Sequence, residues 1–108
     1  MDLEKLIHDW RESVPKYAEA KANVVYLTEF RKSKKAILIR QAETQGLKTG
    51  QERESYAYSH QEYIDLLNAL KEATEECESL RYRMEIARER IQLWKTKQME
   101  RMSERKHY

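Results

Sequence analysis

The chain has 108 residues and a nearly balanced charge, with 21 basic and 19 acidic residues giving a formal net charge of +2. Its length limits it to a single domain, and just over half of its residues are Ala, Glu, Lys, Leu or Arg, the composition of long helices and coiled coils. Large aliphatic residues are too few for a sizeable globular core, so the composition favours an all-α fold with a thin, elongated apolar seam.

The first predicted element is an amphipathic helix over residues 2–13, on which apolar residues from Leu3 to Trp10 recur at helical spacing. Pro15 lacks an amide hydrogen and disfavours helical backbone at the residue before it, so we expect a kink there. A second helix is expected over residues 16–44. The apolar stripe keeps its phase across the proline, which favours one kinked helix or two nearly collinear helices over a chain reversal.

The helix over residues 16–44 carries a second apolar face, formed by Tyr26, Phe30 and Ile37 beside the main stripe. The main stripe itself includes charged residues at Arg31 and Lys34. Two apolar faces on one helix predict two packing partners.

A loop is expected over residues 45–50, where both glycines of the sequence lie. Gly46 can end the preceding helix in a left-handed conformation. Thr49 and Glu52 have the spacing of a capping box, which predicts a short helix over residues 51–57.

The longest predicted element is a helix over residues 60–104, in a stretch without glycine or proline. Ser59 and Glu62 form a second capping-box pattern at its start. Apolar residues then follow a 3–4 repeat for more than four heptads, the pattern of a seam between packed helices. The seam residues are Tyr63, Leu66, Leu70, Ala73, Cys77, Leu80, Met84, Ala87, Ile91 and Trp94.

Net charge alternates along the chain, being negative over residues 1–30, positive over 31–48, negative over 49–85 and positive over 86–108. An antiparallel helical hairpin would place each block beside one of opposite sign, whereas a parallel partner in register would pair like charges. The pattern therefore predicts a single coiled-coil-like hairpin domain spanning residues 1–108.

In this hairpin we expect Trp10 to lie near Trp94. One strip per helix would be buried, and the remaining apolar residues would need another cover, so we expect a homo-oligomer, with a dimer favoured. The expected interface residues are Tyr26, Phe30, Ile37, Tyr82, Ile86 and Leu93.

No residue pattern indicates catalytic chemistry. His8, His60 and His107 lie far apart and lack further ligands at zinc spacing, and no phosphate loop or nucleophile motif occurs. We therefore expect no enzyme activity, no cofactor and no metal site. The lone Cys77 is interpreted as a buried residue in a reducing compartment.

Two basic regions are candidates for nucleic-acid binding through phosphate contacts. Their residues are Arg31, Lys32, Lys34, Lys35, Arg40, Lys95, Lys97, Arg101, Arg105 and Lys106. In the alternative interpretation, the cluster around Arg31 and Lys34 pairs with acidic residues of the long helix, namely Glu72, Glu75 or Glu76, and the basic end is a solvated, frayed helix.

Four segments carry a resemblance to a protein family: KANVVYLTEFRKSKKA at 21–36, QERE at 51–54, YIDLL at 63–67 and RIQLW at 90–94. Their order resembles that in small, functionally uncharacterised helical proteins of tailed bacteriophages and prophages. The resemblance implies a bacterial host cell and slightly favours a role linked to DNA, and it brings no catalytic residues.

The sequence contains no apolar run long enough to span a membrane, and its first residues, MDLEKLIHDW, are acidic and amphipathic rather than a signal peptide. We therefore expect a cytoplasmic protein without a membrane partner. The expected function is that of a phage-type accessory protein that binds an unidentified protein partner. The alternative is a nucleic-acid-binding accessory factor in phage replication or recombination.

Overall fold

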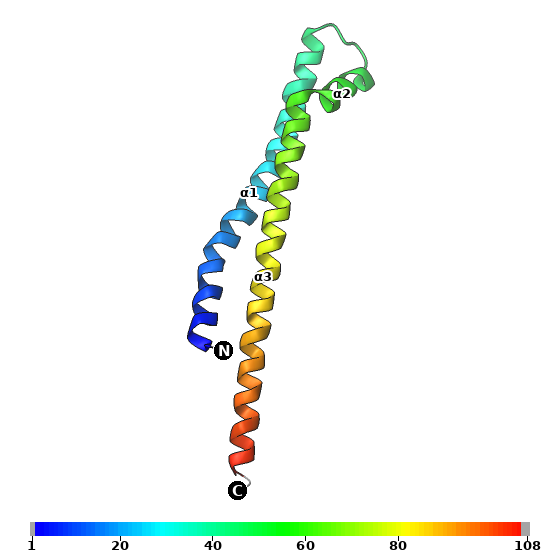
Figure 1. The fold of residues 1–108 in the computed structure, drawn as a ribbon. Helices are drawn as coiled ribbons and strands as arrows, with labels where there is room; N and C mark the ends of the chain where they lie inside the picture. Colours follow the sequence, from blue (N-terminus) through cyan, green and yellow to red (C-terminus); the bar gives the residue numbers. More distant parts are fainter. Residues whose placement is uncertain (1, 107–108) are drawn as a thin grey trace. The chain divides into compact units, whose positions relative to one another are not determined.

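The computed structural model describes residues 2–106, and over these residues the chain forms three α-helices and no strand (Figure 1). Helix α1 spans Leu3–Thr44, α2 spans Gly50–Ser59 and α3 spans Gln61–Lys106. The prediction of an all-α fold is thereby confirmed. Within the described range, none of these helices is both long and apolar enough to cross a lipid bilayer.

Contacts divide the chain into two compact units. The central unit comprises Ala20–Glu76, and the terminal unit comprises Met1–Glu19 and Cys77–Tyr108. Nearly all buried side chains of the described residues belong to the central unit, and in the terminal unit Cys77 alone is buried. The core of the molecule therefore lies in the central unit.

The seam predicted for α3 matches the observed burial. Tyr63, Leu66, Ala73 and Cys77 are buried, and the other six seam residues are half-buried. The buried side of α3 thus follows the 3–4 spacing expected of a helix that packs along one side.

Of the two alternatives expected at Pro15, the structure has the single helix, because α1 continues through the proline without interruption. Proline removes a single hydrogen bond, to the carbonyl of Arg11, and both residues are exposed, so water can satisfy that carbonyl. The apolar stripe that keeps its phase on both sides favours continuation of the helix over termination.

Gly46 ends α1 as predicted, with a positive φ of 89°. The amide of Gly46 donates to the Glu43 carbonyl at 3.1 Å, and the amide of Leu47 donates to the Ala42 carbonyl at 3.1 Å. These two bonds form a Schellman motif, which satisfies carbonyls that the end of a helix leaves without partners.

Replacing Gly46 with alanine is expected to lower the free energy of unfolding by about 1 kcal/mol, because a Cβ is disfavoured at this positive φ. No atom lies within 4 Å of the added Cβ, so the cost comes from the backbone alone. Urea denaturation followed by circular dichroism measures it. Gly50→Ala is the matched control, since Gly50 has no positive φ and begins α2, and it should be neutral or stabilising. If both variants lost the same free energy of unfolding, the cost of Gly46→Ala could not be assigned to the positive φ at Gly46.

Helix α2 begins with the predicted cap, since the amide of Glu52 donates to the Thr49 hydroxyl at 3.1 Å. It is longer than predicted, because the Ser59 hydroxyl donates to the Ser55 carbonyl at 2.7 Å and remains part of α2. The capping box predicted for Ser59 and Glu62 is therefore wrong. Instead, the His60 imidazole Nδ1 accepts from the Glu62 amide at 3.1 Å at the start of α3.

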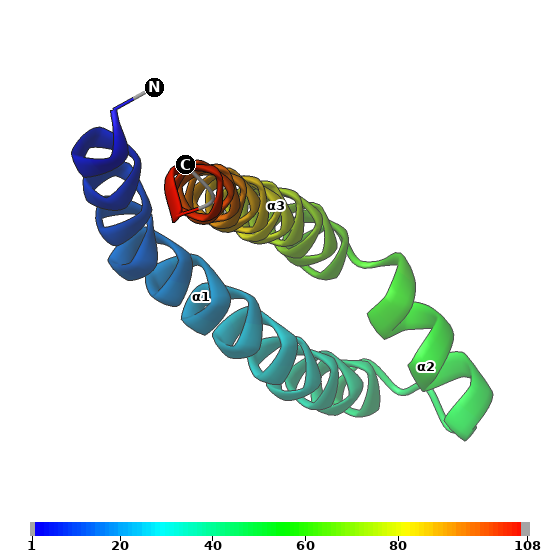
Figure 2. The same cartoon turned by 90° about the horizontal axis from the view of Figure 1, so that it is seen from below.

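Within the central unit, α2 links the end of α1 to the start of α3, as Figure 2 shows. Leu38 of α1, Ala57 of α2 and Tyr63 of α3 form its core cluster, with Ile39 and Tyr56 packed against it. Leu38 and Ala57 are both completely inaccessible to solvent. All three helices thus meet at one small apolar cluster.

Candidate interaction surfaces

The lysines of the predicted basic cluster in α1 are paired inside the central unit. Lys32 Nζ lies 3.3 Å from Glu29 Oε1 on the same helix. Lys34 Nζ lies 3.0 Å from Glu62 Oε2 of α3. Lys35 Nζ lies 3.9 Å from Glu54 Oε1 of α2 and 4.7 Å from the ring centroid of Tyr58. These contacts favour the structural interpretation of the cluster, while Arg40 is exposed and forms no ion pair among the described residues.

The acidic partner of Lys34 differs from the expected ones. The expectation was Glu72, Glu75 or Glu76, which begin about 15 Å further along the axis of α3 than Glu62. The reason is the position of α2, whose Ala57 packs against Leu38 and occupies the side of α1 near its end. Helix α3 therefore begins beside the turn of α1 that contains Lys34 and not beside the last turn of α1.

The terminal unit shows an offset in the same direction. Trp10 lines a small pocket of about 180 Å³ together with Met84 and Arg88 of α3, among others. Trp94, its expected neighbour, lies about 15 Å beyond Met84 along the helix. The predicted pairing of the two tryptophans is therefore wrong.

The ion pair between Lys34 and Glu62 lowers the pKa of the Glu62 carboxyl, first through the hydrogen bond from Lys34 and then through its charge. A carboxyl whose pKa is lower in the folded than in the unfolded state contributes stability above its unfolded pKa. That contribution is lost as the pH falls through the folded pKa. The pair should therefore stabilise the central unit at neutral pH and cease to do so in acid.

Replacing Lys34 with methionine is expected to raise the pKa of Glu62 toward its ordinary value of about 4.3, because the donor and the positive charge are removed. Titration of the Glu62 side-chain carboxyl by nuclear magnetic resonance measures the change. Lys21→Met, which removes an exposed lysine elsewhere on α1, is the control and should leave this titration unchanged. An unaltered Glu62 pKa in Lys34→Met would show that the pair does not form in solution.

The second apolar face of α1 is exposed in the central unit. Tyr26 is 64%, Phe30 39% and Ile37 48% accessible. The rings of Tyr26 and Phe30 stack with centroids 5.9 Å apart. Val25, which the sequence patterns did not single out, is also exposed. The face is an ordered apolar surface that the central unit does not cover.

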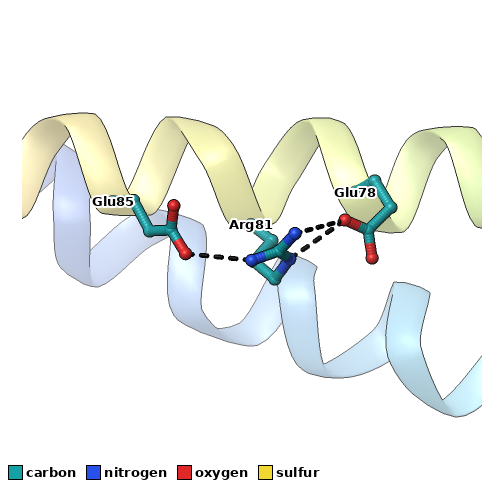
Figure 3. A network of polar contacts seen from close by, with 3 residues as sticks. All are labelled: Glu78, Arg81 and Glu85. Atoms are coloured by element: carbon teal, nitrogen blue, oxygen red, sulfur yellow. Dashed lines mark hydrogen bonds and ion pairs between the residues drawn. The ribbon is translucent and has the colours of Figure 1, made fainter.

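The apolar residues expected on the outside of α3 are exposed as well. Tyr82, Ile86 and Leu93 are each about half accessible in the terminal unit. Beside Tyr82, the Arg81 guanidinium donates to Glu78 at 2.7 Å and to Glu85 at 3.0 Å (Figure 3). Arg81 also lies 4.5 Å from the centroid of the Tyr82 ring. These contacts raise the pKa of Arg81 and hold the side chain against α3.

Four of the basic residues near the end of α3 are accessible to solvent. Lys95, Lys97, Arg101 and Arg105 are exposed, and none of them forms an ion pair within the part of the chain that the structure describes. The side chain of Lys106 lies outside the described residues. Met99 and Met102 are also exposed among these cations. The sequence patterns missed both methionines, because the 3–4 spacing of the seam continues beyond Trp94 at Gln98 and Arg101 and both methionines lie off it.

No protein-family model matches this chain, and no curated protein or solved structure is significantly similar to it.

Proposed function

We propose that this chain is a non-enzymatic helical interaction module, which self-associates and binds another protein through its exposed apolar faces. The observation that carries the proposal is the stacked, exposed pair Tyr26 and Phe30, which continues at helical spacing to Ile37. Exposed apolar residues that gather on one side of a helix mark a surface that another chain covers. Tyr82, Ile86 and Leu93 form a second such surface on α3.

The proposal includes an antiparallel hairpin of α1 and α3, which would present these faces on a stiff support. Two pockets within the terminal unit support this direction. Leu6 lines one pocket with Arg90, and Trp10, which comes later on α1, lines another with Met84, which comes earlier on α3. The alternating charge blocks favour the same pairing. The resemblance to small phage proteins favours an accessory role in an infected bacterial cell.

The test compares association of the wild-type protein with that of Phe30→Glu/Ile37→Glu by sedimentation velocity over a range of concentrations. Carboxylates on this face should abolish association that depends on it, because burying an unpaired charge is strongly unfavourable. Ala18→Glu/Ala36→Glu adds the same charges at exposed positions of α1 that lie about a quarter turn away from this face, and it is the matched control. The same variants, used as bait in bacterial lysate with nuclease, test binding to another protein. Unchanged association and unchanged capture in Phe30→Glu/Ile37→Glu would refute the proposal.

A second candidate function is nucleic-acid binding by the end of α3, favoured by its exposed cations that lack ion pairs among the described residues. Phosphate-driven binding should be strongest at low salt and should fall steeply as salt is added. Fluorescence anisotropy with labelled single- and double-stranded DNA measures it, with Lys97→Glu/Arg101→Glu as the disrupted variant. No binding of the wild-type protein at low salt would eliminate this candidate.

A further inference from the structure

The outer side of α3 in the terminal unit carries a second 3–4 repeat, separate from the seam. Tyr82, Ile86 and Leu93 are its apolar members, and each is about half accessible. The Thr96 hydroxyl donates to the Gln92 carbonyl at 3.0 Å, so it needs no partner from another chain. The full repeat, which we call the outer strip, consists of Ser79, Tyr82, Ile86, Glu89, Leu93 and Thr96. The outer strip has the spacing of half a coiled-coil seam.

One edge of the outer strip is acidic, because Glu78 and Glu85 each precede one of its residues. Arg81, about a third of a turn from the strip, donates to Glu78 Oε2 at 2.7 Å and to Glu85 Oε1 at 3.0 Å (Figure 3). The other oxygen of each carboxylate accepts no hydrogen bond from the described residues, and both side chains are about half accessible. The two carboxylates are therefore held in position and can each accept a further hydrogen bond.

The other edge of the outer strip is basic, because Arg83, Arg90 and Lys97 each follow one of its residues. All three are exposed, and none forms an ion pair within the part of the chain that the structure describes. Arg83 and Arg90 line a pocket of about 260 Å³ that also includes Ile86 and Asp9. The guanidinium groups thus lie beside the apolar residues of the strip, and they are available to a carboxylate of another chain.

The two edges favour one direction for a second copy. In a parallel, in-register pair of helices, the two-fold axis runs along the helices, so the acidic edge of each copy faces the basic edge of the other. A residue on the acidic edge then meets the residue five positions later in the second copy. This rule pairs Glu78 with Arg83 and Glu85 with Arg90, and each pair occurs twice. In an antiparallel pair like edges meet, so the arginines of the two copies would repel each other.

The charges of the outer strip and its neighbours also balance within each copy. The acidic residues are Glu78, Glu85 and Glu89, and the basic residues are Arg81, Arg83 and Arg90. Two copies can therefore meet here without net repulsion. Glu89, the one charged residue within the strip, would have Arg90 of the second copy among its neighbours, because the repeat position after it borders the same layer in a parallel pair. A second copy of the chain thus matches the outer strip in both spacing and charge.

We propose that a second copy of this chain covers the outer strip through a parallel, in-register contact between the two α3 helices over residues 78–97. Tyr82, Ile86 and Leu93 of one copy meet the same residues of the other, with the ion pairs on both sides. This inference deepens the proposed function, on which it rests for self-association, by naming the partner and its direction at the α3 face. The contact is short, so the dimer is weak and forms at high protein concentration.

The first test is sedimentation velocity of full-length Ile86→Ala/Leu93→Ala over a wide range of concentrations. The dimer dissociation constant should rise at least about tenfold, because four aliphatic side chains leave the interface of the dimer. Met99→Ala/Met102→Ala is the matched control, since it removes exposed apolar side chains from other sides of the same helix and should leave the dimer intact. Circular dichroism checks that both variants remain helical. A wild-type protein that stays monomeric, or an Ile86→Ala/Leu93→Ala variant that dimerises like the wild type, overturns the proposal.

The second test determines the direction of the helices with one exposed residue. Gln92 lies on the acidic edge, five positions before Lys97, and it forms no ion pair in its own chain. In the parallel dimer, Gln92→Glu should lower the dissociation constant about threefold by adding a pair with Lys97, and Gln92→Lys should raise it by a similar factor. Glutamine, glutamate and lysine have similar helix propensities, so α3 itself should not change. In an antiparallel dimer Gln92 would face the acidic edge, and the order would be reversed.

A reversed order of the two Gln92 variants, or equal dissociation constants for both, overturns the proposal even if the protein dimerises. Phe30→Glu/Ile37→Glu separates this inference from the proposed function, because it changes no residue of the outer strip. If this variant lost the dimer while Ile86→Ala/Leu93→Ala kept it, the proposed function would stand through the face on α1, and the contact between α3 helices would be refuted.

Discussion

Leu38→Ala is expected to lower the free energy of unfolding by about 3 kcal/mol, because it leaves a cavity where all three helices meet. The Leu38 side chain is completely inaccessible and packs with Ala57 and Tyr63, which come from α2 and α3. So small a cluster has few neighbouring side chains that could move into the space. Urea denaturation followed by circular dichroism, at a protein concentration below that of self-association, measures the loss.

The adjacent residue provides the control. Ile37 lies on the same turn of α1 but is 48% accessible, so Ile37→Ala should change the free energy of unfolding by less than about 0.5 kcal/mol. The two substitutions remove aliphatic side chains of equal volume from neighbouring positions and therefore have the same effect on the intrinsic preference for helix within a few tenths of a kcal/mol. The assignment places Leu38 in the core and Ile37 outside it. Similar losses of unfolding free energy in the two variants would contradict that assignment.

The buried side of each helix could be predicted from the sequence, because it follows from the regular spacing of apolar residues along the chain. Any helix that packs along one side buries residues at 3–4 spacing, and the residues from Tyr63 to Trp94 follow that spacing without interruption. Even the charged residues within the α1 stripe, Arg31 and Lys34, are half-buried as their phase implies. The exposed outer residues, such as Phe30 and Ile86, follow from the same periodicity.

The errors concern interactions that depend on distant residues. The hydroxyl of Ser59 can cap α3 or extend α2, and sequence spacing does not decide between the two. The structure extends α2, and the position of that short helix then determines which glutamate Lys34 meets. Predicting these contacts requires knowing that Ala57 packs on Leu38, which neither residue signals alone.

The candidate surfaces were predicted only in part, for a similar reason. In the sequence, a cluster of basic residues such as Lys34 and Lys35 indicates phosphate binding whether or not its members form ion pairs with acidic residues of the same chain. The acidic partners of these two lysines lie on two other helices. Near the end of α3, Met99 and Met102 lie off the 3–4 seam among many charged residues, so periodicity did not identify them as exposed apolar residues. A charge pattern identifies basic segments, but the fold decides which of them are available.

Ala57→Asp is the substitution with the largest expected effect, lowering the free energy of unfolding by at least about 3 kcal/mol at neutral pH. Ala57 is completely inaccessible between Leu38 and Tyr63, and no basic side chain belongs to this cluster, so the new carboxylate would be buried among apolar groups. Ser55→Asp is the matched control, because Ser55 is exposed on the same helix and its substitution should have little effect.

The pH dependence separates charge burial in Ala57→Asp from simple crowding. Burial raises the pKa of an aspartate in the folded state above its unfolded value of about 3.9, so the folded protein binds the proton more tightly. Stability of the variant relative to the wild type should therefore increase as the pH falls through the raised folded pKa, and the benefit should be complete below the unfolded pKa. Ala57→Asn, which has nearly the same volume but no charge, should show no such recovery in acid. Denaturation of the three proteins between neutral pH and about pH 4 measures the difference, and a pH-independent deficit in Ala57→Asp would attribute the loss to volume alone.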